Sequence, residues 1–69
     1  MKVYVMCEAA LFSPEKYVGV KSSQKKAEKA FREKYPHCRK FEGSCGNWNA
    51  ASDNSDAPKL LFIHEEEVD

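Results

Sequence analysis

The fold is decided between Tyr17 and Tyr35, where the chain reads YVGVKSSQKKAEKAFREKY. Its first five residues alternate between two sides, the period of two that is typical of a β-strand. From Gln24 onward the residues are almost all strong helix formers, and apolar side chains recur three and four positions apart. The segment therefore predicts a strand, Tyr17 to Lys21, that leads directly into a helix, Gln24 to Tyr35.

Both ends of this helix carry recognisable signals. Ser22 and Ser23 offer hydroxyls that can accept from the first free backbone N–H groups. Pro36 ends the helix, because the residue before a proline is pushed out of helical geometry. The helix has a narrow apolar stripe, formed by Ala27, Ala30, Phe31 and Tyr35. We expect the alanines to let the helix approach a sheet closely, with Phe31 as the main anchor in the core.

The segment before this one predicts the other strand of a hairpin. Lys2 to Ala10 alternates Val3, Val5 and Cys7 on one face with polar and larger residues on the other, and residues 11–16 contain the Ser-Pro pair of a turn. We expect Val3, Val5 and Cys7 to face the core, with Cys7 as a small core hydrophobe.

The C-terminal half predicts two more strands and a short fifth one. Cys38 to Glu42 can form a third strand, and Lys59 to Glu66 a last strand that is apolar on both faces and belongs inside the sheet. Between them, residues 43–58 are rich in Gly, Ser, Asn and Asp and predict a flexible loop. We favour a short strand at Asn47 to Ala51 within it, then a loose turn at 52–58.

These elements predict one α+β domain over residues 1–69. The architecture is an antiparallel sheet of four or five strands with one amphipathic helix on one face, in the order β-β-α-β-(β)-β. Sixty-nine residues exclude two independent cores. The acidic residues at 65–69 are expected to form a frayed C-terminus. An exposed edge strand would allow a homodimer as well as a monomer.

The composition restricts the partners and the location. Eleven basic and eleven acidic residues cancel, so no overall charge draws the chain to nucleic acid or to an anionic membrane. The distribution is uneven: residues 21–40 carry eight basic and two acidic residues, a net charge of +6, and residues 41–69 carry a net charge of −6. No apolar run approaches the ~18 residues of a membrane span. With no export signal, three cysteines indicate free thiols and a cytoplasmic protein.

The basic helix is the first candidate for function. Lys25, Lys26, Lys29 and Arg32 could contact a partner protein, or neutralise phosphates within a nucleic-acid-binding region spanning residues 21–40. The ordinary alternative is a solvated helix face in which Glu28 and Glu33 pair with these cations. The near-neutral balance of the chain favours a solvated face over a nucleic-acid footprint.

Trp48 is the second candidate, because it lies in a polar stretch between two asparagines. Tryptophan is enriched in binding hot spots. The alternative, of equal weight, is that Trp48 folds back to cover one end of the sheet. We include Trp48 with the four helix cations as the predicted partner-binding residues.

Metal binding and catalysis are not predicted. The residue types that bind zinc are present at Cys7, His37, Cys38, Cys45 and His64. Their spacing lacks the close pairs of structural zinc sites. A nucleophile would need Cys38 or Cys45 beside His64, and nothing beyond residue identity supports that pairing. We therefore expect no metal, no cofactor and no catalytic residue.

Three features resemble a class of small proteins encoded by phages and mobile elements, which includes anti-CRISPR and other anti-defence inhibitors. They are the opening Lys2-Val3-Tyr4-Val5, the joint from Val18 to Ser23, and the small residues Ala27 and Ala30. The resemblance implies a non-enzymatic protein that blocks a host protein or ribonucleoprotein complex by occupying a surface. It transfers no functional residue. The alternative function is nucleic-acid binding through the basic helix.

Overall fold

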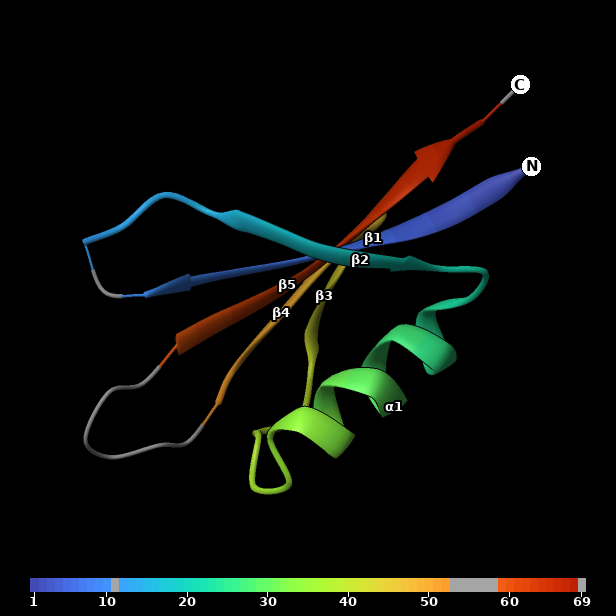
Figure 1. Cartoon of the computed structure of the whole chain (residues 1–69). Helices are drawn as coiled ribbons and strands as arrows, with labels where there is room; N and C mark the ends of the chain where they lie inside the picture. The colour runs from blue at the N-terminus through green and yellow to red at the C-terminus, as the bar shows by residue number, and fades with distance from the viewer. Residues whose placement is uncertain (11, 53–58, 69) are drawn as a thin grey trace.

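The computed structural model describes residues 1–10, 12–52 and 59–68. The elements, in chain order, are β1 (Lys2–Ala10), β2 (Lys16–Lys21), α1 (Gln24–Lys34), β3 (Glu42–Ser44), β4 (Asn47–Ala51) and β5 (Lys59–Glu67). The five strands form one antiparallel sheet, and α1 lies on one side of it (Figure 1). The predicted fold class is confirmed, and so is the short strand at Asn47–Ala51.

The strand order is β2-β1-β5-β4-β3, so the last strand in sequence lies at the centre of the sheet. This position explains why β5 is apolar on both faces, as predicted for an interior strand. Lys2 pairs with Glu67, and the two ends of the chain therefore lie side by side (Figure 1). The prediction of a frayed acidic tail is wrong for residues 65–67, which belong to β5, whereas residue 69 lies outside the described residues.

Helix α1 is capped and packed as its sequence predicts. The Ser23 hydroxyl accepts a hydrogen bond from the backbone N–H of Lys26 at 3.2 Å. At the other end, the Tyr35 N–H donates to the Phe31 carbonyl at 2.7 Å, immediately before Pro36. Ala27 and Phe31 are fully buried. The helix covers a core formed by Met6, Ala27, Phe31, Phe41, Ala50, Leu61 and Ile63.

The face of β1 that points to the core is not the predicted one. Met6 pairs with Ile63 and belongs to the core, so the helix side of β1 carries the even-numbered residues. Cys7 lies half-buried on the opposite side of the sheet, and Cys38 is the cysteine that packs against the core. The prediction failed because the helix covers the less apolar face of β1, and alternation alone does not identify the face that a helix covers.

The third strand begins later than predicted. Cys38 to Phe41 are not in a strand, and β3 starts at Glu42. The Cys38 N–H donates to the Tyr35 carbonyl, which continues the turn after the helix. The ring of Phe41 then enters the core and stacks on Phe31, with 5.6 Å between ring centroids. These two contacts hold the segment under the helix end, and the Arg39 N–H donates to the carbonyl of Ala51 on β4 at 2.9 Å.

A tight hairpin joins β3 to β4 inside the segment predicted as a flexible loop. Its two turn residues, Cys45 and Gly46, both have positive φ, at 56° and 82°. This is the geometry of the two-residue turn that matches strand twist. Gly43 is required because a Cβ at that position would collide with the Asn47 carbonyl oxygen. Residues 43–44 and 47–51 are therefore strand, and the predicted loose turn lies outside the described residues at 53–58.

Candidate functional site on the open face of the sheet

The sheet side that faces away from α1 is here called the open face. Strand register places alternate side chains of all five strands on it. On β4 these are Asn47, Asn49 and Ala51, whereas the apolar part of the face lies on β1, β2 and β5. Its principal members are Val3, Val5, Cys7, Tyr17, Leu60, Phe62 and His64. No helix within the described ranges lies over this side of the sheet (Figure 1). The open face is thus an apolar sheet surface without a covering element in that part of the chain.

Two side chains of this surface are substantially exposed to solvent. Leu60 keeps 48% of its surface exposed and Tyr17 keeps 63%, while Phe62 and Val5 are half-buried. Antiparallel sheets with one solvated face normally carry polar residues there. Contiguous apolar side chains on an accessible surface instead mark a site of interaction. The open face therefore has the character of a contact surface.

Polar side chains gather around His64 on this side of the sheet. The Nδ1 atom of His64 lies 2.8 Å from Asn47 Oδ1, and its Nε2 lies 2.8 Å from Glu15 Oε1. The Cys7 sulfur completes the group, and the ligand atoms of Cys7, Glu15 and His64 all lie within 4.8 Å of one another. Three separate segments of the chain supply these residues: β1, the turn before β2, and β5.

The Cys7 thiol is not an activated nucleophile in this environment. Burial raises the pKa of Cys7, and the negative charge of Glu15 raises it further. Reactive cysteines have a lowered pKa and lie beside positive groups. His64 Nε2 is already engaged by Glu15. The cluster therefore does not form the nucleophile and base pair of a covalent enzyme.

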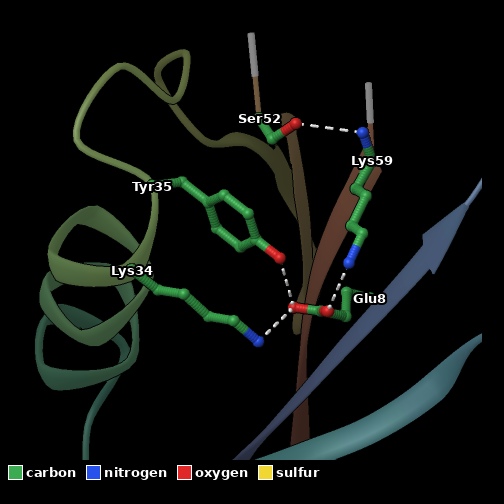
Figure 2. A network of polar contacts seen from close by, with 5 residues as sticks. All are labelled: Glu8, Lys34, Tyr35, Ser52 and Lys59. Carbon is green, nitrogen blue, oxygen red and sulfur yellow. Dashed lines mark hydrogen bonds and ion pairs between the residues drawn. The ribbon is translucent and has the colours of Figure 1, made fainter. Parts of the chain in front are cut away.

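A second polar cluster lies on the helix side of the sheet and has a structural role. We call Glu8, Lys34, Tyr35 and Lys59 the Glu8 cluster (Figure 2). Glu8 is 7% exposed. Its Oε2 accepts from Lys34 Nζ and from the Tyr35 hydroxyl, both at 3.1 Å, and its Oε1 lies 3.4 Å from Lys59 Nζ. These contacts fasten the C-terminal end of α1 to β1 and β5.

Electrostatics in the Glu8 cluster favour the charged forms of Glu8 and Lys59. Burial by itself raises the pKa of Glu8, but hydrogen bonds from Lys34, Tyr35 and Lys59, together with the Lys34 charge, leave the pKa lowered. The hydrogen bond to Glu8 raises the pKa of Lys59. Glu8 thus stays ionised at neutral pH and cannot act as a general acid there.

These two shifts predict how stability depends on pH. The contribution of Glu8 is complete above its ordinary pKa near 4.5 and is lost as the pH falls through its lowered folded-state value. The contribution of Lys59 is complete below its ordinary pKa of 10.5 and is lost as the pH rises through its raised value. We expect urea unfolding to show the largest difference between wild type and Glu8→Gln at neutral pH. The difference should shrink in acid below about pH 4, and a constant difference would contradict this role.

The sequence-predicted helix cations are all accessible. Lys25, Lys26, Lys29 and Arg32 are exposed on α1. Arg32 pairs with Glu28 at 3.4 Å, as the solvated-face interpretation expects. No acid of the described residues lies within 4.0 Å of the Lys25 or Lys29 ammonium group, so the other expected pairs do not form. The four cations lie on the helix side of the molecule, opposite the open face.

Trp48 lies on β4, on the helix side of the sheet. It pairs with Ile63, is half-buried, and packs against the core. Its ring centroid lies 6.1 Å from that of Tyr4. Trp48 therefore covers one end of the sheet, which is one of the two roles that its sequence context left open. Its role in partner binding stays a prediction.

The five residues of zinc-binding type separate into four places. His37 is exposed after the helix, Cys38 packs against the core, and Cys45 is exposed in the β3–β4 turn. All three cysteines are free. Only Cys7 and His64 come together, and their neighbour Glu15 was not among the expected ligands. No local spacing signals this group, because its members are joined only by strand pairing.

The described surface has shallow grooves. A groove of about 260 Å³ lies between β2 and α1, with Met6 and Phe31 at its base. Another, of about 230 Å³, is lined by Lys21, Lys26 and Lys29. A third groove, of about 330 Å³, falls at the lower end of the ~300–1,000 Å³ range of small-molecule sites and is lined by Arg39, Lys40, Glu42, Asn49, Ala50 and Ala51. None of these three grooves includes the Cys7, Glu15 and His64 group.

Comparisons of the chain with protein-family models, with curated protein sequences and with solved structures give no match. Helix α1, with 11 residues, is the one helix of the described chain, and it lacks the length and apolar character needed to cross a membrane.

Proposed function

We propose that this protein is a non-enzymatic protein-binding module that acts by occupying a surface of its partner, and that the open face is its contact surface. The observation that carries this proposal is the apolar open face itself. Val3, Val5, Leu60 and Phe62 form a continuous strip on β1 and β5 with no described element over it. Burying this strip against a partner would supply the hydrophobic free energy that the isolated domain does not gain.

The charges around the strip indicate the chemistry of the partner. Register places Glu66 on the open face beside Val3, and Glu15 reaches the same side at His64. Among the described residues, no lysine or arginine is placed there by strand register. A complementary partner surface is apolar at its centre and basic at its rim. We infer a host protein, or the protein part of a ribonucleoprotein complex, in the cytoplasm.

The resemblance to phage anti-defence inhibitors supports this class of action. Such proteins block a host complex by occupying one of its surfaces, which requires a contact face and no active site. The raised pKa of Cys7 agrees with a protein that does not use this thiol as a nucleophile. On this proposal the protein is an inhibitor of a host defence complex.

The test compares the two sides of the molecule. We expect Tyr17→Lys with Leu60→Lys to weaken partner binding at least about tenfold, because ammonium groups would enter an apolar contact. The matched control, Lys25→Glu with Lys29→Glu, changes two exposed residues on the opposite side and should keep binding. Both pairs are exposed, so each variant should keep the fold. Binding is measured by quantitative pulldown from host lysate, followed by titration with the purified partner.

Unchanged binding by the Tyr17→Lys and Leu60→Lys variant would contradict the open face as the contact surface. Loss of binding in the helix variant alone would assign the contact to Lys25 and Lys29, as the sequence predicted. Light scattering of the purified protein at several concentrations identifies the case in which a second copy covers the open face. In that case the open-face variant would be monomeric and the wild type dimeric.

Nucleic-acid binding is the second candidate, favoured by the gathering of Lys21, Lys26 and Lys29 around one groove. Several phosphate contacts would give a steep fall of log affinity with log salt. Titration with single-stranded and duplex DNA and RNA would reveal that slope. No binding at about 50 mM salt would remove this candidate.

A further inference from the structure

We propose that Cys7, Glu15 and His64 form a binding site for a single Zn²⁺ ion on the open face. The site uses one sulfur, one nitrogen and one oxygen ligand from this chain and leaves the fourth position to water. It is independent of the proposed function, because the three ligands belong to one chain and need no partner.

The geometry of the group suits a tetrahedral ion. The three ligand atoms lie within 4.8 Å of one another. Bonds of about 2.3 Å to sulfur and about 2.0–2.2 Å to nitrogen and oxygen place tetrahedral ligands about 3.3–3.8 Å apart. The His64 Nε2–Glu15 Oε1 distance of 2.8 Å is shorter than this, and the exposed Glu15 side chain can rotate to admit the ion. The backbone of β1 and β5 holds the other two ligands, since Cys7 pairs with Phe62 and Val5 pairs with His64.

The hydrogen bonds of His64 point to a cation beside its Nε2. The amide nitrogen of Asn47 donates to the Cys45 carbonyl at 3.4 Å, which turns the Asn47 oxygen toward the ring. An amide oxygen only accepts, so Nδ1 carries a hydrogen and donates to it. In the neutral ring, Nε2 then presents a lone pair to the Glu15 oxygen 2.8 Å away. A proton joins the two atoms at this distance, and a metal ion could take its place once the Glu15 carboxylate moves to the ~3.3 Å that separates tetrahedral nitrogen and oxygen ligands.

The same arrangement matches the outer contacts of zinc-bound histidines. Such histidines bind the metal through one ring nitrogen and donate from the other to a protein oxygen, which fixes the ring and its tautomer. Asn47 supplies that oxygen here. Zn²⁺ also balances the charge of a thiolate and a carboxylate held close together. On binding, the Cys7 S–H bond breaks, the sulfur keeps the electron pair, and the proton passes to solvent.

The test uses Co²⁺ as a spectroscopic substitute and Zn²⁺ as its competitor, with the full chain under reducing conditions. We expect one Co²⁺ per chain, d–d bands of tetrahedral intensity, and a sulfur-to-metal charge-transfer band. One equivalent of Zn²⁺ should displace the Co²⁺ and remove these bands. Cys7→Ser should abolish the charge-transfer band, and His64→Gln or Glu15→Gln should weaken binding at least tenfold. Asn47→Ala should weaken binding about 10- to 100-fold through loss of the outer contact.

The matched controls change the other exposed ligand types. Cys45→Ser and His37→Gln should bind Co²⁺ as the wild type does, because neither residue belongs to the site. Circular dichroism confirms that each variant is folded, and His64→Gln replaces Cys7→Ser as the decisive variant if the latter does not fold. The proposal is overturned if the wild type binds no metal at micromolar concentration, which would leave an imidazolium–carboxylate ion pair. It is also overturned if Cys45→Ser, rather than Cys7→Ser, removes the charge-transfer band.

Discussion

Replacing Phe31 with alanine should leave the protein largely unfolded at 25 °C. Phe31 is 1% exposed and is one of the largest fully buried side chains. Deleting such a ring costs about 3–5 kcal/mol. The core of a domain of this size contributes a net stability of only about 3–5 kcal/mol. The substitution therefore removes about as much free energy as the fold possesses.

The expected loss of stability is large because the Phe31 ring makes two sets of contacts. It joins α1 to the sheet, and it stacks on Phe41, which fixes the chain between α1 and β3. Far-ultraviolet circular dichroism and a urea titration measure the result. Phe31→Leu keeps most of the buried volume and should still unfold cooperatively. A cooperative transition in Phe31→Ala with less than about 1 kcal/mol of lost stability would show that the helix is anchored elsewhere.

Replacing Lys34 and Lys59 together with methionine should cost about 2–4 kcal/mol at pH 7. The double change leaves the Glu8 carboxylate buried with only the Tyr35 hydroxyl as a polar partner. Removing the partners of a fully buried charge costs about 3–5 kcal/mol. The cost here is smaller, because the two lysine side chains are 53% and 42% exposed and solvent already screens them.

A third substitution distinguishes the loss of charge partners for Glu8 from the loss of packing by the lysine side chains. Methionine keeps much of the apolar stem of lysine, so most of the cost comes from the unpaired carboxylate. Adding Glu8→Gln to the double variant should therefore recover much of the lost stability in urea unfolding. Lys25→Met with Lys29→Met is the matched control and should change stability by less than about 0.5 kcal/mol. A triple variant no more stable than the double would contradict the mechanism.

The elements that could be predicted from sequence are those with strong local signals. The helix was located by its capping serine and by Pro36, and β1 by its alternation over Lys2–Ala10. β5 was placed inside the sheet because Leu60 to Ile63 are apolar without alternation. Each of these signals lies within the element that it predicts, so no knowledge of distant contacts was needed.

The errors concern choices that only tertiary contacts decide. The core side of β1 was assigned wrongly because the helix covers Met6 and its neighbours, although Val3, Val5 and Cys7 form the more apolar face. β3 was placed too early because the burial of Phe41 under the helix end overrides the β-propensity of its neighbours. The candidate zinc ligands could not be grouped, since His64 is distant in sequence from Cys7 and Glu15 and meets them only through the pairing of β1 with β5.

The central place of β5 has a consequence for synthesis on the ribosome. Every residue pair between β1 and β5 joins the beginning of the chain to its end. A nascent chain that lacks β5 can form the first hairpin, the helix and the β3–β4 hairpin, but it has nothing to join them. Closure of such long loops must precede most stabilising contacts, which makes folding slow for so short a chain. The native structure therefore forms only after β5 has left the ribosome, and the apolar strands are open to chaperones until then.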